Sequence, residues 1–138
     1  MTDNWIILDD FTDDNNYIWK RKLLVRNGVN IGIVRELFPE DNKFDETDGE
    51  TTASDTTFTS VNGNFQTRKI VAGDFIILTS GDDARTFEIN SVTSETELEL
   101  KSAPTSTASS LSYTLQKNCS GQVYPEEQIA IERQEYGV

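Results

Sequence analysis

A cluster of oxygen-bearing side chains near the N-terminus, at Asp9–Asp10 and Asp13–Asn16, is the first candidate for chemistry. Hard cations such as Ca²⁺ bind carboxylate and amide oxygens. An EF-hand loop, however, needs a glycine at its sixth position and a glutamate at its twelfth, and counting from Asp9 these positions hold Asp14 and Lys20. We therefore interpret the cluster as a solvated acidic turn, with a calcium site as the alternative.

Three glutamates, Glu95, Glu97 and Glu99, are spaced two residues apart, which aligns their carboxylates on one face of a strand. Paired carboxylates catalyse glycoside hydrolysis. The alternation with Leu98 explains them more simply, as the solvent-facing side of a sheet. Thiol chemistry has no support either, because the single cysteine, Cys119, has no histidine to act as its base. We predict a protein without catalytic residues.

The complete absence of histidine excludes several further kinds of site. It removes the Ser-His-Asp nucleophile system, the HExxH metalloprotease helix and every His-ligated zinc or haem site. A lone cysteine also cannot form an internal disulfide, so the chain does not depend on an oxidising compartment. We expect no metal and no cofactor.

The charge of the chain limits its partners. Twenty-four acidic residues against 12 basic ones give a net charge of −12, which argues against a protein that binds nucleic acid by neutralising phosphates. The one basic cluster is Lys20–Lys22 with Arg26, and in a strand Arg21 would face away from its two neighbours. We interpret the cluster as a solvated surface or one that forms intermolecular salt bridges, with an anionic partner, chiefly nucleic acid, as the alternative. No apolar run approaches the ~20 residues of a membrane span.

The elements that would position these residues are predicted to be short strands, because apolar residues recur with a period of two. An Asn27-Gly28 pair between residues 19–26 and 29–37 favours a β-hairpin, with a short helix over 17–25 as the alternative. Five more strands are expected at residues 66–71, 74–78, 86–92, 97–100 and 111–116. Because so many short strands lie close together, a small β-barrel or sandwich is the economical arrangement.

Polar stretches and apolar runs refine this prediction. Residues 45–57 and 102–112 are rich in Asp, Glu, Ser and Thr, and both are expected to be loops. The run Phe75–Leu78 is apolar without alternation, which predicts a central strand covered on both sides. Residues 125–136 begin with a proline and two glutamates, as helices do, yet their isoleucines alternate as in a strand.

We therefore expect a mainly β protein with three parts. Residues 1–50 form an N-terminal arm with a β-hairpin, residues 51–117 a small β-barrel domain, and residues 118–138 an irregular or helical C-terminal tail. Aromatic side chains outside the expected barrel are candidates for contacts with other subunits, since aromatics anchor interfaces. These candidates are Trp5, Tyr17, Trp19, Tyr124 and Tyr136, and the alternative is that they cover the barrel from outside.

Four segments of the middle region carry a resemblance to a known class of proteins. They are residues 53–58 (ASDTTF), 71–78 (VAGDFIIL), 81–89 (GDDARTFEI) and 92–100 (VTSETELEL). These segments comprise a polar lead-in, a Gly-Asp turn, a strand, a second Gly-Asp turn, a strand ending in Ser-Val and a Thr-Glu-Leu strand. This order resembles a module that recurs in structural proteins of tailed bacteriophages. The resemblance covers residues 53–116.

This resemblance implies a virion protein that works by assembly and is not an enzyme. The first expectation is a head-to-tail connector, of the neck, stopper or adaptor type, forming a homo-oligomeric ring below the portal. Its partners would be copies of itself and other virion proteins of the portal, tail or capsid, with at most non-specific contact with DNA passing through an acidic channel and none with a membrane. It would be assembled in the host bacterial cytoplasm.

Two alternatives remain open. One is a capsid decoration or cement protein that uses the N-terminal 50 residues as a clamping arm. The other is a binding module of a tail fibre or baseplate, in which Trp5 or Trp19 stacks on a host glycan and residues 102–112 provide the contact surface.

Overall fold

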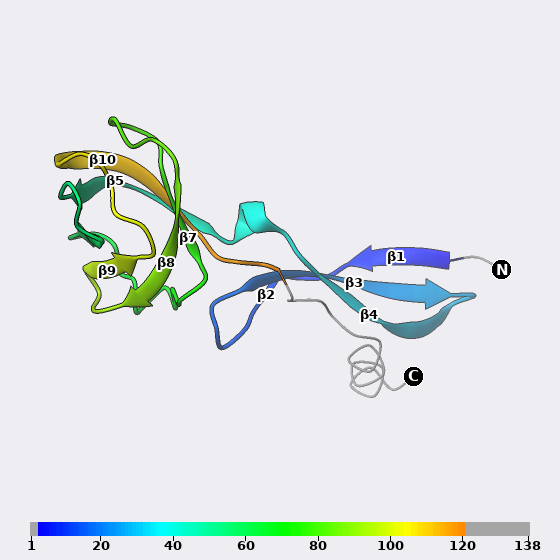
Figure 1. Ribbon diagram of the computed structural model, residues 1–138. Coiled ribbons are helices and arrows are strands. Elements are labelled where there is room, and N and C mark those ends of the chain that lie inside the picture. The colour runs from blue at the N-terminus through cyan, green and yellow to red at the C-terminus, as the bar shows by residue number, and fades with distance from the viewer. Residues whose placement is uncertain (1–2, 121–138) are drawn as a thin grey trace. The chain divides into compact units, whose positions relative to one another are not determined.

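The computed structural model describes residues 3–120 (Figure 1). Its elements are β1 (Asp3–Ile7), β2 (Phe11–Thr12), β3 (Ile18–Arg26), β4 (Val29–Leu37), the 3-10 helix η1 (Pro39–Asp41), β5 (Lys43–Thr51), β6 (Thr57–Ser60), β7 (Phe75–Leu78), β8 (Thr86–Val92), β9 (Glu97–Leu100) and β10 (Ala108–Gln116). The chain divides into two compact units. We call residues 42–118 the barrel unit, and the described residues 3–41 with 119–120 the sheet unit. No helix in the described part of the chain is long and apolar enough to cross a membrane.

The barrel unit is a closed antiparallel barrel of six strands in the order β10-β5-β6-β9-β8-β7. The mainly β fold predicted from the sequence is thus confirmed, in its barrel form. The alternation in β8 and β9 explains why these segments are strands: Phe87 and Ile89 point inward, as do Leu98 and Leu100, while the residues between them are less buried. Closure leaves no barrel strand with an unpaired edge.

The interior of the barrel is filled by side chains. Phe58 and Tyr113 meet edge to face, with ring centroids 5.1 Å apart, a favourable geometry for aromatic pairs. Gly49 lies against both rings, so closely that a Cβ atom there would sit 2.7 Å from Phe58 Cζ. The buried cluster consists of Phe58, Phe65, Ile70, Ile76, Leu78, Phe87, Ile89, Leu98, Leu100, Leu111, Tyr113 and Leu115.

The expectation that residues 45–57 form a loop is wrong for most of that stretch. β5 pairs with β10 along one edge and with β6 along the other, so main-chain hydrogen bonds hold a strand whose side chains are mainly polar. Its carboxylates are satisfied by donors on other segments, among them Thr114 for Asp45 and Arg68 for Glu46. As a result the barrel unit begins at Asn42, whereas the sequence had placed its start at residue 51.

Three further expectations are corrected. Only Ile76 and Leu78 of β7 are fully buried, so this strand has one core face and is not covered on both sides. β10 begins at Ala108, because that residue pairs with Thr51, so the expected loop at 102–112 ends earlier. Residues 66–71 form turns instead of a strand, and a carboxylate holds them: the amide and hydroxyl of Thr67 both donate to Glu95, at 2.6 and 2.5 Å.

The sheet unit contains the predicted hairpin. β3 and β4 pair around Asn27 and Gly28, whose positive φ values of 52° and 78° fit the tight turn that an Asn-Gly pair favours. The alternative of a helix over residues 17–25 is therefore wrong. β3 is the central strand, with β4 along one edge and β1 and β2 in succession along the other. The expected tail at 118–138 lies almost entirely outside the described residues.

Candidate functional site

β1 carries three consecutive exposed apolar side chains. Trp5, Ile6 and Ile7 are 47%, 48% and 78% exposed, three consecutive residues in an acidic chain. They belong to both faces of the sheet, because successive side chains on a strand point to opposite sides. Trp5 and Ile7 share one face and Ile6 lies on the other, so β1 exposes apolar side chains on both sides of the sheet, as strands that contact other molecules do.

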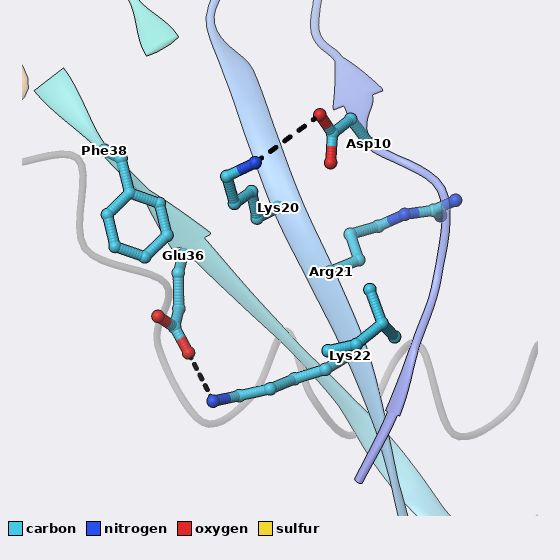
Figure 2. Close-up of a pocket in the computed structure, with 7 residues that line it drawn as sticks. Asp10, Lys20, Arg21, Lys22, Glu36 and Phe38 are labelled. Atoms are coloured by element: carbon cyan, nitrogen blue, oxygen red, sulfur yellow. Dashed lines mark ion pairs between the residues drawn. The ribbon is translucent and has the colours of Figure 1, made fainter. Parts of the chain in front are cut away.

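A cavity of about 220 Å³ lies beside β1 on the face that Ile7 shares with Lys20 and Lys22 (Figure 2). Lys22 Nζ lies 2.6 Å from Glu36 and 4.8 Å above the Trp5 ring centre. The cavity is lined by Ile7, Asp10, Lys20, Arg21, Lys22, Glu36 and Phe38.

The basic cluster is largely neutralised within the unit. Lys20 Nζ lies 3.9 Å from an oxygen of Asp10 and 3.6 Å from an oxygen of Asp41; Figure 2 marks the Lys20–Asp10 pair together with that of Lys22 and Glu36. Arg26 pairs with Asp3 at 2.8 Å, and this hydrogen bond lowers the pKa of the Asp3 carboxyl. The salt bridges that the structure shows for this cluster lie within the chain, and the intermolecular bridges expected from the sequence stay a prediction. The resulting surface combines apolar groups with paired charges, which suits a protein contact better than a free phosphate.

The acidic turn predicted at residues 9–16 is organised by Asp13. Its Oδ1 accepts hydrogen bonds from the amides of Asn15 and Tyr17, at 2.9 and 3.0 Å, and its Oδ2 accepts one from Trp19 Nε1 at 2.8 Å. These are the contacts of a loop-stabilising carboxylate. Within residues 3–120, no group of three or more His, Cys, Asp or Glu side chains is arranged to hold a metal ion.

The structure separates the five aromatic candidates. Trp5 is exposed on β1, whereas Tyr17 and Trp19 are each only 7% exposed. Tyr124 and Tyr136 lie outside the described residues. Ile6 and Ile7 were missed as candidates, although the run of apolar residues that begins at Trp5 was visible in the sequence.

The barrel unit carries a polar groove of about 470 Å³ at its surface. Thr51 donates from its hydroxyl to the Ser106 carbonyl at 3.0 Å across this region. The lining contains no aromatic ring, and both tryptophans belong to the sheet unit. The lining residues are Glu50, Thr51, Thr52, Asp55, Thr57, Thr59, Thr107, Ala108 and Ser109.

A chain of hydrogen bonds leads from the barrel core to its surface. The Tyr113 hydroxyl donates to Ser60 Oγ, and Ser60 donates to Asp48 Oδ1, both at 2.5 Å. Burial raises the pKa of Tyr113 to about 12. Burial alone would also raise the pKa of Asp48, but hydrogen bonds from Ser60 and the Asn62 amide bring it below its usual value. Asp48 therefore serves as a charged acceptor for the hydroxyl of the buried Ser60 and for the exposed Asn62 amide.

A second carboxylate connects two loops of the barrel. Asp83, in the connection between β7 and β8, accepts hydrogen bonds from four groups of the β9–β10 connection. The donors are the hydroxyls of Thr105 and Ser106, each at 2.7 Å, and the amides of the same residues. The Thr105 hydroxyl, followed by that of Ser106, holds the pKa of Asp83 well below its usual range. Asp83 therefore holds two connections of the barrel together.

Comparisons with known proteins add little. No protein-family model and no curated protein matches the chain. Among solved structures, a phage phi92 endosialidase is similar over 83% of this chain, with 14% sequence identity and a TM-score of 0.43. The chain spans only 18% of the length of that protein. A likeness this weak carries no argument about fold or activity.

Proposed function

We propose that this chain is a non-catalytic structural protein of a tailed bacteriophage particle, in which the barrel unit is a rigid body and the sheet unit provides an attachment surface. The exposed apolar strand β1 is the observation that carries the proposal. A solvent-facing run of Trp5, Ile6 and Ile7 reduces solubility unless another chain covers it. Such a strand is therefore expected to be buried in an assembly.

The use of the carboxylates supports a non-catalytic role. Asp48, Asp83 and Glu95 each accept at least two hydrogen bonds from the chain, and the pKa of each is lowered. A general acid needs the opposite shift, toward neutral pH. These groups hold loops together at neutral pH instead of transferring protons.

The role as a head-to-tail connector rests on the resemblance of residues 53–116 to phage structural modules. The charge of the barrel unit is compatible with it, since residues 42–118 contain twelve Asp and Glu against six Lys and Arg. A ring of such barrels would present an acidic channel from which DNA is repelled. Capsid decoration and a tail-fibre or baseplate module are the alternatives, and the polar groove of the barrel would be the contact surface for a glycan.

Counting the chain on intact particles tests the proposal. Particles of a phage that encodes the chain would be purified and imaged by electron microscopy, with a label fused to the C-terminus of the chain. We expect a fixed copy number, in a ring below the portal for a connector, over the shell for decoration, or at the tail tip for a receptor-binding module. Absence from the particles, or turnover of a substrate by the purified chain, would contradict the proposal.

A further inference from the structure

The outer edge of β1 presents unpaired main-chain groups. The Leu8 amide donates to the Arg21 carbonyl at 3.0 Å, so the main-chain groups of Leu8 point toward β3. Main-chain groups of an antiparallel strand alternate between its two sides. The amides and carbonyls of Asp3, Trp5 and Ile7 therefore point away from β3. Among residues 3–120 no strand pairs with this edge, and Figure 1 shows β1 at the margin of its sheet.

This edge lacks the features that normally prevent pairing with another chain. Natural edge strands are protected by charged residues, especially lysine, by prolines or by bulges; β1 (DNWII) has no lysine or proline, and its one charge, Asp3, is paired with Arg26. The register with β3 changes only after the end of β1. Leu8 is bonded to Arg21 and Phe11 pairs with Trp19, so Asp9 and Asp10 lie opposite a single residue of β3 and form a bulge. The open edge is thus straight over the five residues of β1.

We infer that two copies of this chain pair through β1, antiparallel and centred on Trp5, to form one continuous sheet. In this register Trp5 faces Trp5 of the second copy, and Asp3 faces Ile7 of the second copy. Every outward amide then meets an outward carbonyl, which gives six main-chain hydrogen bonds across the two-fold axis. The edge is therefore complementary to itself.

Side chains on both faces fit the same register. Leu24 is the neighbour of Trp5 on β3, so the central row across the two copies is Leu24, Trp5, Trp5 and Leu24. Aromatic pairs directly opposite each other stabilise antiparallel strands. On the other face Ile6 lies opposite Asn4 of the second copy, and no like charges face each other.

The local balance of charge favours a second copy as the occupant. Two chains of charge −12 repel each other over most of their surface. Around β1 the charges are balanced, because Asp3 pairs with Arg26 and Lys22 with Glu36. The edge of β1 is thus a place where two copies can approach with little repulsion. A strand of an unrelated protein is the competing occupant, and the test below distinguishes it.

The inference deepens the proposed function, since it names one partner of the sheet unit, yet the two can fail separately. A two-fold interface joins only two copies, so this interface alone cannot build a ring of more than two chains. A decoration protein can use the pair directly, whereas a connector ring needs a second interface between copies. Copy number on particles tests the virion role, and behaviour of the purified chain tests the pairing.

Amide exchange in the purified full-length chain tests the register. At low concentration we expect the amides of Trp5 and Ile7 to exchange fast and those of Asn4 and Ile6 slowly, since only the latter are bonded to β3. At high concentration all four should exchange slowly. If the chain dimerises but the amides of Trp5 and Ile7 still exchange fast, the proposed interface is wrong. A monomer of 15.5 kDa at every concentration would overturn the pairing itself and favour a strand of another protein as the occupant.

Two variants examined by sedimentation equilibrium complete the test. Ile7→Pro removes an outward amide and leaves the bonds to β3 intact, and since each dimer loses two hydrogen bonds the dissociation constant should rise about 30-fold. Trp5→Lys places like charges opposite each other and should leave only monomers. Val29→Lys is the matched control, because it adds the same charge at an exposed apolar residue of β4 and should leave the dimer unchanged. Dimers of wild-type strength in both β1 variants would refute the inference.

Discussion

Adding one methyl group at Gly49 tests whether the barrel core is as tightly filled as the structure indicates. In Gly49→Ala the new Cβ would lie 2.7 Å from Phe58 Cζ and 3.0 Å from Tyr113 Cδ1. Both rings are buried, and they already touch each other edge to face. Neither ring can therefore move aside without displacing the rest of the core.

The expected loss of stability follows from two opposing effects. Replacing glycine by alanine reduces the entropy of the unfolded chain and would stabilise the protein by about 0.4–1 kcal/mol if the methyl group fitted. Overpacking a core costs about 1–3 kcal/mol. We expect overpacking to win, with a net destabilisation of about 1–2 kcal/mol. The two tryptophans lie in the sheet unit, so unfolding of the barrel should be followed by circular dichroism in urea and not by tryptophan fluorescence.

A second variant shows whether the contact with Phe58 is the cause. Phe58→Leu removes ring atoms from the space that the new methyl group would enter, so Gly49→Ala should cost at least about 0.5 kcal/mol less in that background than in wild type. The midpoint of urea unfolding should shift while its slope stays the same. A neutral or stabilising Gly49→Ala, or strict additivity of the two changes, would refute the account of the core.

Three further predictions concern single side chains. Hydrogen bonds hold the pKa of Asp83 below its usual 3.8, so the carboxylate stabilises the fold fully above pH 3.8 and loses this effect as the pH falls toward its folded-state pKa. Asp83→Asn should therefore be less stable than wild type at neutral pH. The midpoints of urea unfolding should show this difference shrinking in acid. Ile76→Asp should abolish folding of the barrel, because it leaves an unpaired charge in the core, whereas Ile77→Asp on the outer face should still give a folded chain by circular dichroism. Trp19→Phe should destabilise the sheet unit by about 1 kcal/mol through loss of its hydrogen bond to Asp13, and normal stability with impaired assembly would instead make Trp19 an interface residue.

The parts of the fold that the sequence predicted are those in which side chains alternate. β8 and β9 have apolar residues at every second position, and the hairpin of β3 and β4 has an Asn-Gly turn, so local pattern and final structure agree. The apolar run of β7 lacked alternation, and the strand proved to have only one buried face. A half-buried Phe75 or Ile77 on the outer face is not distinguishable from a core residue by type alone.

The strand that could not be predicted is β5, where most side chains are polar. It is a strand because β6 and β10 lie on either side of it, and pairing with segments distant in sequence leaves no local trace. The hydroxyls and guanidinium that satisfy its carboxylates come from Ser60, Thr114 and Arg68. Acidic and Thr-rich composition predicts a loop only when no partner strands exist to pair with it.

The two tryptophans also show that residue type alone does not predict which side chain is buried, and they indicate where an attachment surface should be sought. Trp5 and Trp19 were equivalent candidates by residue type, yet Trp19 lies on the central strand β3 and is fixed by Asp13, while Trp5 lies on an edge. Strand order decides which of the two can meet another chain, and composition does not encode strand order. Since burial of Trp19 already stabilises the monomer, an interface has little free energy to gain there. Trp5, with unpaired main-chain groups beside it, can still contribute both apolar area and hydrogen bonds. The proposed attachment surface therefore rests on the edge of the sheet and not on aromatic residues as a class.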